Sequence, residues 1–388
     1  HWEPVRIEDD DEPMDDQAAL AQAYNPVADG ARTIKKMLFA TKVWHSEQRD
    51  AGRSVVEAAG EWRNDRTDWL AGRFAGSVAA RWHYSQGRPY GHLRIFGFRV
   101  HDDQAFLDEV EQLIALMPTR GLIVDVRSNP GGLVWAAEGL LQLLTPNLIR
   151  PIRFSFVATD MTRAMAAARQ NGHLRQWAES LNAAVASGVT HSRSIPLTSP
   201  QRCNNRGQVY PGPVVALVDA NTYSAGDLFA AGFVDNHVGK LVCTDTATGG
   251  GGANIWTPRQ VNAALLNTDF ELADLGDASY TVAIRRAVRI GDITSEIEDV
   301  GVTASFRRPP TKRDLTEKNR DLLDYACRLL DTEVKTDLQY EIVEPELRVR
   351  VDGLSRVELD VDGSPRTTAV PDAAGRAALV LPDHWRQH

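Results

Sequence analysis

Short apolar runs alternate with stretches of helical spacing along the middle of the chain. Each run ends at turn-forming residues and is followed by a segment with an apolar stripe. The expected strands are residues 91–98, 121–127, 151–157, 213–219, 239–244 and 280–289. The expected helices are residues 103–117, 133–145, 160–188, 224–236 and 314–332. Such alternation predicts an α/β core built from strand–helix units.

The pattern differs at both ends of the chain. Residues 1–30 are acidic and weakly patterned, and from Ala31 to about Arg81 the apolar spacing is helical. After Thr332 the polar and apolar residues alternate with period two, interrupted by turn residues. Three domains are therefore predicted: an acidic and helical segment over 1–87, an α/β domain over 88–334, and a small β module over 335–388.

Composition narrows the classes of partner. The 388 residues are 43% apolar, enough for a large core, and the net charge of −9 argues against nucleic acid. No apolar run approaches the ~18 residues of a membrane span, and no motif indicates a metal or a cofactor. Three cysteines are an odd number in a long chain, which favours a reducing compartment such as the cytoplasm over a disulfide framework. Because the chain starts with His1 rather than Met, a removed leader stays an open alternative.

Two turns carry the candidate chemistry. An apolar strand runs from Gly121 into the turn Asn129-Pro-Gly-Gly132, where glycine lets backbone N–H groups approach a substrate closely. A second strand starts at Val214 and delivers Ser224 to the first turn of a helix, whose positive end favours a developing negative charge. A hydroxyl beside two sources of oxyanion stabilisation predicts acyl transfer, with Ser224 as the nucleophile.

Each turn also has a simpler interpretation. Ser224 with Asp227 three positions later fits a helix N-cap close to a capping box, and Asn129–Gly132 fits an ordinary turn. The combination favours a site, because both turns follow strands and open α/β sheets place their sites at the carboxyl ends of strands.

Five segments, in this order, carry a resemblance to a known family: Tyr90–Phe98, Arg127–Gly132, Tyr223–Phe233, Ile297–Val302 and Asn319–Leu330. Over roughly residues 88 to 332 the chain resembles the tail-specific, or C-terminal processing, serine proteases. That family includes tricorn protease and chlamydial protease-like activity factor. The resemblance implies a crotonase-like, ClpP-related core and makes 88–334 the catalytic domain.

The resemblance also implies an activity and roles for named residues. The expected function is a serine peptidase that cleaves extended or unfolded polypeptide by acyl-enzyme chemistry, with Ser224 as nucleophile. The oxyanion donors would be the N–H groups of Gly131, or its neighbour Gly132, and of Ala225, while Glu298 would orient a histidine base. The expected partner is polypeptide substrate, bound as an added strand, and the oligomeric state stays open.

The general base is the open part of this prediction. One branch of the family uses a lysine in a Gly-Lys-Gly turn, but Gly249 stands at that place here, so no lysine base is expected. The other branch uses a histidine, which the sequence does not identify. His92 is expected at the opposite end of the sheet, and His237 at the far end of the helix after Ser224, nearly ~20 Å away. The remaining candidates are His1, His45 and His101, or a residue outside this chain.

Two other functions fit parts of the sequence. A catalytically inactive family member acting as a peptide-binding or scaffolding protein would explain the missing lysine and the unidentified histidine. An acyl-CoA enzyme of the crotonase type would explain Tyr223–Asp227, although not Glu298 or the closing helix.

Overall fold

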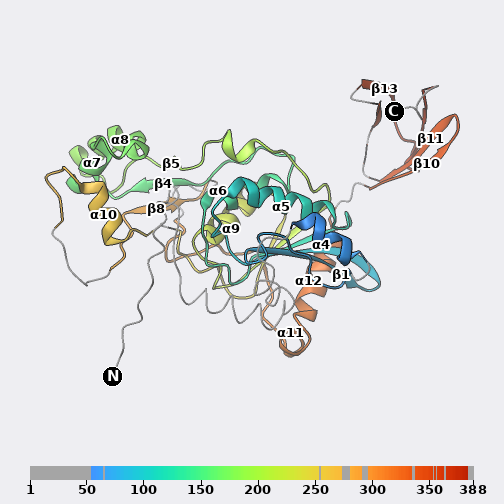
Figure 1. Ribbon diagram of the computed structural model, residues 1–388, viewed down its shortest axis with the longest axis horizontal. Helices are drawn as coiled ribbons and strands as arrows, with labels where there is room; N and C mark the ends of the chain where they lie inside the picture. Colours follow the sequence, from blue (N-terminus) through green and yellow to red (C-terminus); the bar gives the residue numbers. More distant parts are fainter. Residues whose placement is uncertain are drawn as a thin grey trace.

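A six-stranded sheet forms the centre of the computed structural model (Figure 1). The structure describes residues 54–63, 66–252, 255–272, 280–290, 296–333, 337–352, 354, 356–361 and 364–382. The strand order is β1-β2-β3-β6-β7-β9; β1 and β2 are antiparallel, and all other neighbours are parallel. The strands are β1 Val78–Ser85, β2 Arg88–Ile95, β3 Leu122–Asp125, β6 Val214–Val218, β7 Lys240–Cys243 and β9 Phe306–Arg307.

Helices cover both faces of this sheet, because alternate strand residues point to opposite sides. The helices on one side are α5 Asp103–Ala115, α6 Val134–Gln142 and α9 Ala225–Asp235, and the closing helix on the other side is α12 Arg320–Asp331. On the first face, Leu122 and Val124 pack in a core with residues of helices α5, α6 and α9. On the other face, Ile123 packs in a separate cluster with the closing helix α12. The parallel strands are apolar on both faces for this reason.

A second, antiparallel sheet lies beside the six-stranded sheet, and three further helices lie next to it (Figure 1). Its strand order is β5-β4-β8, from β5 Ile195–Pro196, β4 Arg153–Phe156 and β8 Arg285–Val288. The helices are α7 Asp160–Ala167, α8 Arg175–Ser187 and α10 Pro258–Leu265. The last of these was not expected from the sequence.

The single helix predicted over 160–188 is wrong, because the chain breaks between α7 and α8. Ala168 is extended, and a short 3₁₀ turn follows at Gly172–Leu174. The buried amide of Asn171 donates to the carbonyls of Met165 and Ala264 at 2.8 and 2.6 Å. An asparagine that bonds to backbone carbonyls competes with the helix ladder, which explains the break.

The helical interpretation of 31–81 is wrong where it reaches β1, which pairs along its full length with β2. The stretch 54–63 does hold a helix, α4 Val55–Trp62. The helix expected over 314–332 is divided into α11 Lys312–Thr316 and α12, since Asn319 adopts a left-handed conformation between them. The mixed α/β class with a parallel sheet is confirmed, and the crotonase-like arrangement stays a prediction.

The last part of the chain forms five short strands. They are β10 Asp337–Val343, β11 Glu346–Asp352, β12 Val357–Val361, β13 Ser364–Ala369 and β14 Arg376–Val380. They form a three-stranded sheet, β10-β11-β14, and a two-stranded sheet, β12-β13, around an apolar cluster with Val349, Val357 and Leu379. The period-two alternation after Thr332 predicts strands over 347–352, 356–362 and 377–382, which correspond to β11, β12 and β14, whereas β10 and β13 were not expected. The three domain boundaries stay predictions.

No helix among the described residues has the length and apolar character needed to cross a membrane. The three cysteines are buried free thiols.

A buried charge cluster lies at the end of β3. Asp125 accepts two hydrogen bonds from the guanidinium of Arg127, at 2.8 and 2.6 Å, and one from His92 at 3.4 Å. Arg94 donates to the carbonyls of Asp125 and Arg127, and Arg127 reaches Asn319 at the start of α12. Burial alone would raise the pKa of Asp125, but Arg127 and Arg94 hold it well below its usual range. The cluster fixes the start of the candidate turn against the closing helix.

Replacing Asp125 by Asn should destabilise the protein by about 3–5 kcal/mol, because two buried guanidinium groups lose their counter-charge. The free energy of unfolding in denaturant measures this. The matched control is Asp160→Asn, which removes an exposed pair with Arg163 and should change little. Since the folded-state pKa of Asp125 is lowered, its contribution is complete above the unfolded pKa and fades as pH falls toward the folded value. A similar cost for both variants would contradict a structural role for the cluster.

Candidate active site

The two turns singled out from the sequence lie against each other at the carboxyl ends of β3 and β6. The carboxylate of Asp219 accepts the N–H of Ser128 at 2.7 Å and its hydroxyl at 3.0 Å. The hydroxyl of Thr222 donates to the carbonyl of Val126 at 3.1 Å. Tyr223 N–H donates to the carbonyl of Asn129 at 2.8 Å. Strands β3 and β6 are parallel neighbours, so their ends meet at one edge of the sheet.

Ser224 occupies a strained backbone conformation at the start of α9. Its φ of 54° and ψ of −121° lie in a region that residues other than glycine rarely adopt, and it is 4% exposed. Its side chain makes no capping hydrogen bond to the helix. Ser224 is thus the N-cap residue of α9 by position, as the simpler interpretation expects, but its hydroxyl does not cap the helix.

Gly131 permits the close approach of the two turns. Its φ is 101°, and a Cβ atom there would lie 2.5 Å from Ser224 Cβ and 2.9 Å from the backbone nitrogen of Ala225. The N–H of Gly131 already donates to Asn129 Oδ1 at 2.8 Å. By contrast, the N–H groups of Gly132 and Ala225 have no acceptor among the residues that the structure describes.

The glycine run after β7 packs on the ring of Tyr223. A Cβ atom on Gly249 would lie 2.2 Å from Tyr223 Cδ2, and one on Gly251 would lie 1.9 Å from Cε1. Gly249 N–H also donates to the carbonyl of Thr222 at 2.8 Å. The missing side chains thus make room for an aromatic ring directly before the serine.

Asp227 joins this glycine run to α9. The fully buried carboxylate accepts the Thr248 hydroxyl and the N–H groups of Gly250 and Gly251, the last two at 3.0 Å. Burial raises the pKa of Asp227 to about 6, although these hydrogen bonds and one from the Ser224 backbone act in the opposite direction. From the sequence, Asp227 is expected only as a capping residue of the helix. Its part in ordering the glycine run was therefore missed.

Glu298 lies on a turn that is fixed to the same glycine run. Asp299 N–H donates to the Gly250 carbonyl at 2.9 Å, and Val302 N–H donates to the Thr248 hydroxyl at 2.8 Å. Glu298 Oε1 accepts the N–H of Ala287 at 2.8 Å, whereas Oε2 is buried and has no partner in the described part of the chain. Burial raises the pKa of Glu298, and the nearby charge of Asp227 raises it further.

A buried arginine lies near Glu298. Arg285 on β8 stacks over Phe154 and Phe156, with its guanidinium carbon 5.0 and 5.7 Å from the ring centroids. Burial lowers the pKa of Arg285 to about 9, while the charge of Glu298 acts to raise it. The second sheet thus supplies both a backbone donor and a positive charge to this carboxylate.

None of the histidines in the described residues hydrogen-bonds to Ser224 or Glu298. His92 contacts Arg81 and Asp125 in the buried cluster, and burial lowers its pKa to about 3. His237 follows the far end of α9, as expected. His101 is exposed between β2 and α5, and both His1 and His45 lie outside the described residues.

Lys240 also lies where the sequence predicts, at the first residue of β7. Its amino group bonds to the Thr332 hydroxyl at 2.7 Å and pairs with Glu333 at 2.5 Å, after the end of α12. Because the turn that holds Gly249 follows the opposite end of this strand, the contacts of Lys240 direct it away from Ser224.

The sequence did not identify Asp219 and Thr248, which hold the turns of the site together. A signal was present, since Asp219 is a carboxylate placed directly after a fully apolar strand. Such a polar residue at the end of a buried strand is expected to bond to neighbouring turns.

Comparison with known proteins shows which family and which solved structures part of the chain resembles. The model of Peptidase family S41 matches residues 89–269. Similar solved structures include mature CPAF, with 18% identity over 66% of this chain and a TM-score of 0.49. They also include the photosystem II D1 C-terminal processing protease (18% identity, 63% of this chain and 47% of that chain, TM-score 0.36). Tricorn protease matches with 16% identity over 68% of this chain and 24% of that chain, with a TM-score of 0.32.

The chain spans 55% of the length of the mature CPAF chain. No curated protein matches the sequence significantly.

Replacing Gly131 by Ala should separate the two turns, because the new Cβ atom would collide with Ser224 and with the backbone of Ala225. Together with the positive φ, this should cost about 1–3 kcal/mol of stability. Thermal unfolding provides the measurement. Gly60→Ala in α4 is the control, since nothing lies within 4 Å of its added Cβ, and it should be neutral or stabilising. Equal melting temperatures for Gly131→Ala and the wild type would show that the turns are not in close contact.

Proposed function

We propose that this protein, whose residues 89–269 match the model of peptidase family S41, is a serine peptidase that cleaves extended or unfolded polypeptide. The observation that carries the proposal is the position of Ser224. Its hydroxyl lies on a strained turn without a capping bond, and the N–H groups of the next residue, Ala225, and of Gly132 on the facing turn have no acceptor among the described residues. A nucleophile next to preorganised donors is the arrangement that acyl transfer requires.

The oxyanion donors in this proposal are the N–H groups of Gly132 and Ala225. Gly131, the residue expected from the sequence, supports the site differently, because its own N–H donates to Asn129. Its lack of a side chain brings the turn against Ser224, and the neighbouring Gly132 then provides the donor. Removing one such donor typically lowers the rate by roughly 10²–10³.

Glu298 is proposed to orient the histidine that activates Ser224. A carboxylate with one oxygen bonded to a backbone N–H and the other buried without a partner is suited to accept an imidazole N–H. The ionised carboxylate would then stabilise the imidazolium formed during the reaction. The histidine itself is not assigned, since His1 and His45 lie outside the described residues and His101 makes no contact with Glu298.

The reaction follows from these roles. The Ser224 oxygen attacks the peptide carbonyl carbon while its proton passes to the imidazole, and the carbonyl oxygen becomes an oxyanion held by Gly132 and Ala225. The imidazolium then gives its proton to the leaving amine as the C–N bond breaks, leaving an acyl ester on Ser224. Water attacks the ester with the imidazole again accepting a proton, which releases the carboxylic acid and restores the serine.

Replacing Ser224 by Ala should abolish cleavage of an unfolded protein such as casein and labelling by a fluorophosphonate. The melting temperature should stay close to that of the wild type, because the hydroxyl makes no capping bond. Ser224→Gly should also be inactive but more stable, since glycine adopts φ of 54° without strain. Retained peptidase activity in either folded variant would exclude Ser224 as the nucleophile. Absence of both cleavage and labelling in the wild type would instead favour an inactive peptide-binding protein.

Replacing Glu298 by Gln should lower kcat by about 10²–10⁴ with little change in KM, because the charge that stabilises imidazolium is lost in the transition state. Wild-type activity should rise with pH through an apparent pKa near ~6–7, the range of a histidine base. Steady-state kinetics over a pH series tests both statements. Lys240→Ala is the control and should keep full activity, since its partners lie beyond α12. A loss confined to Lys240→Ala would identify a lysine-dependent mechanism.

A further inference from the structure

The β10-β11-β14 sheet has one covered face and one open face. Val349, Ala377 and Leu379 face the apolar cluster that includes Val357 and Leu359 of β12. Because side chains alternate along a strand, the residues between them point the other way. The open face therefore carries Arg348 and Arg350 of β11 and Arg376 of β14, the arginine face.

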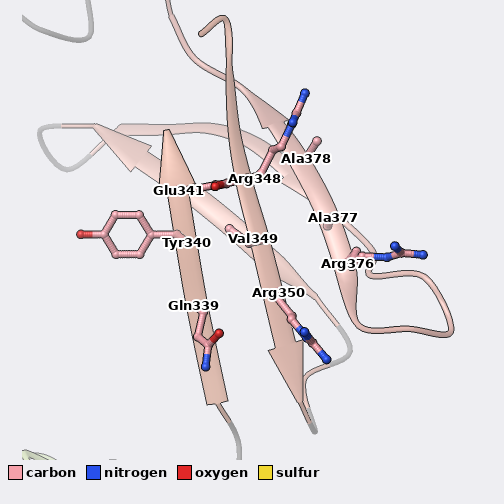
Figure 2. A pocket seen from close by; sticks show the side chains of 9 residues that line it. All are labelled: Gln339, Tyr340, Glu341, Arg348, Val349, Arg350, Arg376, Ala377 and Ala378. Carbon is pink, nitrogen blue, oxygen red and sulfur yellow. The ribbon is translucent and has the colours of Figure 1, made fainter. Parts of the chain in front are cut away.

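This face is hollowed. Figure 2 shows the lining residues of a hollow of about 510 Å³, which include the three arginines, Glu341 and Ala378. Ala378 lies directly across from Arg348 in the strand register, so a small side chain leaves room beside a long one. A hollow of this size is within the range of peptide and small-ligand sites.

Two of the three cations are direct cross-strand partners. Arg350 pairs in register with Arg376, and like charges in that position destabilise a sheet. Arg376 has a partial counter-charge in Asp372 at 3.4 Å, but Arg350 has no ion-pair partner among the described residues. An unfavourable pair of guanidinium groups on the wall of a hollow indicates a site that is completed by an anion.

From these observations we propose that the arginine face binds an extended polypeptide segment that carries carboxylates at alternate positions. Arg348 and Arg350 are two residues apart on one strand, a separation of about 6.6 Å that matches residues i and i+2 of an extended peptide. Guanidinium groups bind carboxylates through paired hydrogen bonds, which favours Asp and Glu over neutral side chains. The small side chain of Ala378 leaves room in the hollow for the peptide residues that lie between the two carboxylates.

The chemistry favours a peptide over a nucleic acid. Glu341 lies directly across from Arg348, and Glu346 pairs with Arg348 at 3.4 Å. A phosphate backbone needs a continuous basic footprint, which these carboxylates interrupt. A peptide can instead direct its carboxylates mainly to Arg350 and Arg376, which are cross-strand partners of each other and not of these acidic residues. Under the proposed function, this peptide would be part of the polypeptide substrate. Only this identification of the peptide as substrate rests on the proposed function.

The test uses the full chain with Ser224→Ala, so that bound peptide stays intact. A fluorescein-labelled peptide with the core Glu-Val-Glu-Val-Glu is compared by fluorescence anisotropy with one in which Gln replaces every Glu. The acidic peptide should bind at least about tenfold more tightly, and added salt should weaken it. Adding Arg350→Gln should weaken binding at least about fivefold while the melting temperature stays equal or rises, because the like-charge pair is removed. Arg356→Gln, an exposed arginine paired with Glu358 and outside the hollow, is the control.

Four results would overturn the proposal. Equal affinity for the acidic and the Gln peptide would show that the arginines do not select carboxylates. Equal loss in Arg350→Gln and Arg356→Gln would show non-specific charge attraction, as would equally tight binding of a single-stranded oligonucleotide. A dimer by light scattering that dissociates in Arg350→Gln, without peptide binding, would assign the face to a second copy of the chain. Because binding is measured without catalysis, an inactive wild type would refute the peptidase function and not this site.

Discussion

The site depends on the hydrogen bonds that the buried carboxylate of Asp219 accepts from the neighbouring turn. This carboxylate accepts the backbone N–H and the hydroxyl of Ser128 from the neighbouring turn, and it orders its own turn by accepting the N–H of Asn221. One ion thus satisfies donors from two segments that are distant in sequence. Hydrogen bonds to a buried charge are stronger than those between neutral groups, which is why a short strand end can hold two loops in register.

The same principle extends outward through Asp227. Its carboxylate collects a hydroxyl and two glycine N–H groups, and the glycine run in turn holds the segment with Glu298. Each step joins a short acidic side chain to backbone N–H groups and hydroxyls. A site assembled in this way depends on these two carboxylates and on its glycines, since Gly131 and Gly251 leave no room for a Cβ atom.

The sequence predicts the core better than the periphery, for physical reasons. Buried parallel strands such as Val214–Val218 are apolar on both faces, and their period and boundaries are visible without any tertiary information. Strand β1 was missed because its pairing with β2, rather than its own spacing, determines its structure. The break at Asn171 was missed because the competing carbonyl of Ala264 is far away in the chain.

For the site, the sequence indicates Ser224 and both turns as candidates, because each combines an unusual local composition with a preceding apolar strand, and the structure brings the two turns into contact. The sequence leaves open whether Gly131 or Gly132 would donate, because the bond from Gly131 to Asn129 is a detail of loop geometry. Asp219 and Thr248 could not be assigned, because their importance lies in which distant N–H groups they meet. The buried unpartnered oxygen of Glu298 is likewise a property of packing and not of local sequence.

The pairing of β3 with β6 has a consequence for folding during synthesis. The paired residues are about ninety positions apart, so the contact forms only after a long connecting segment has been made and closed into a loop. The turn with Gly131 and the turn with Ser224 are therefore separate throughout much of synthesis on the ribosome. A chain that ends before β6 lacks the second turn, so the two cannot come into contact.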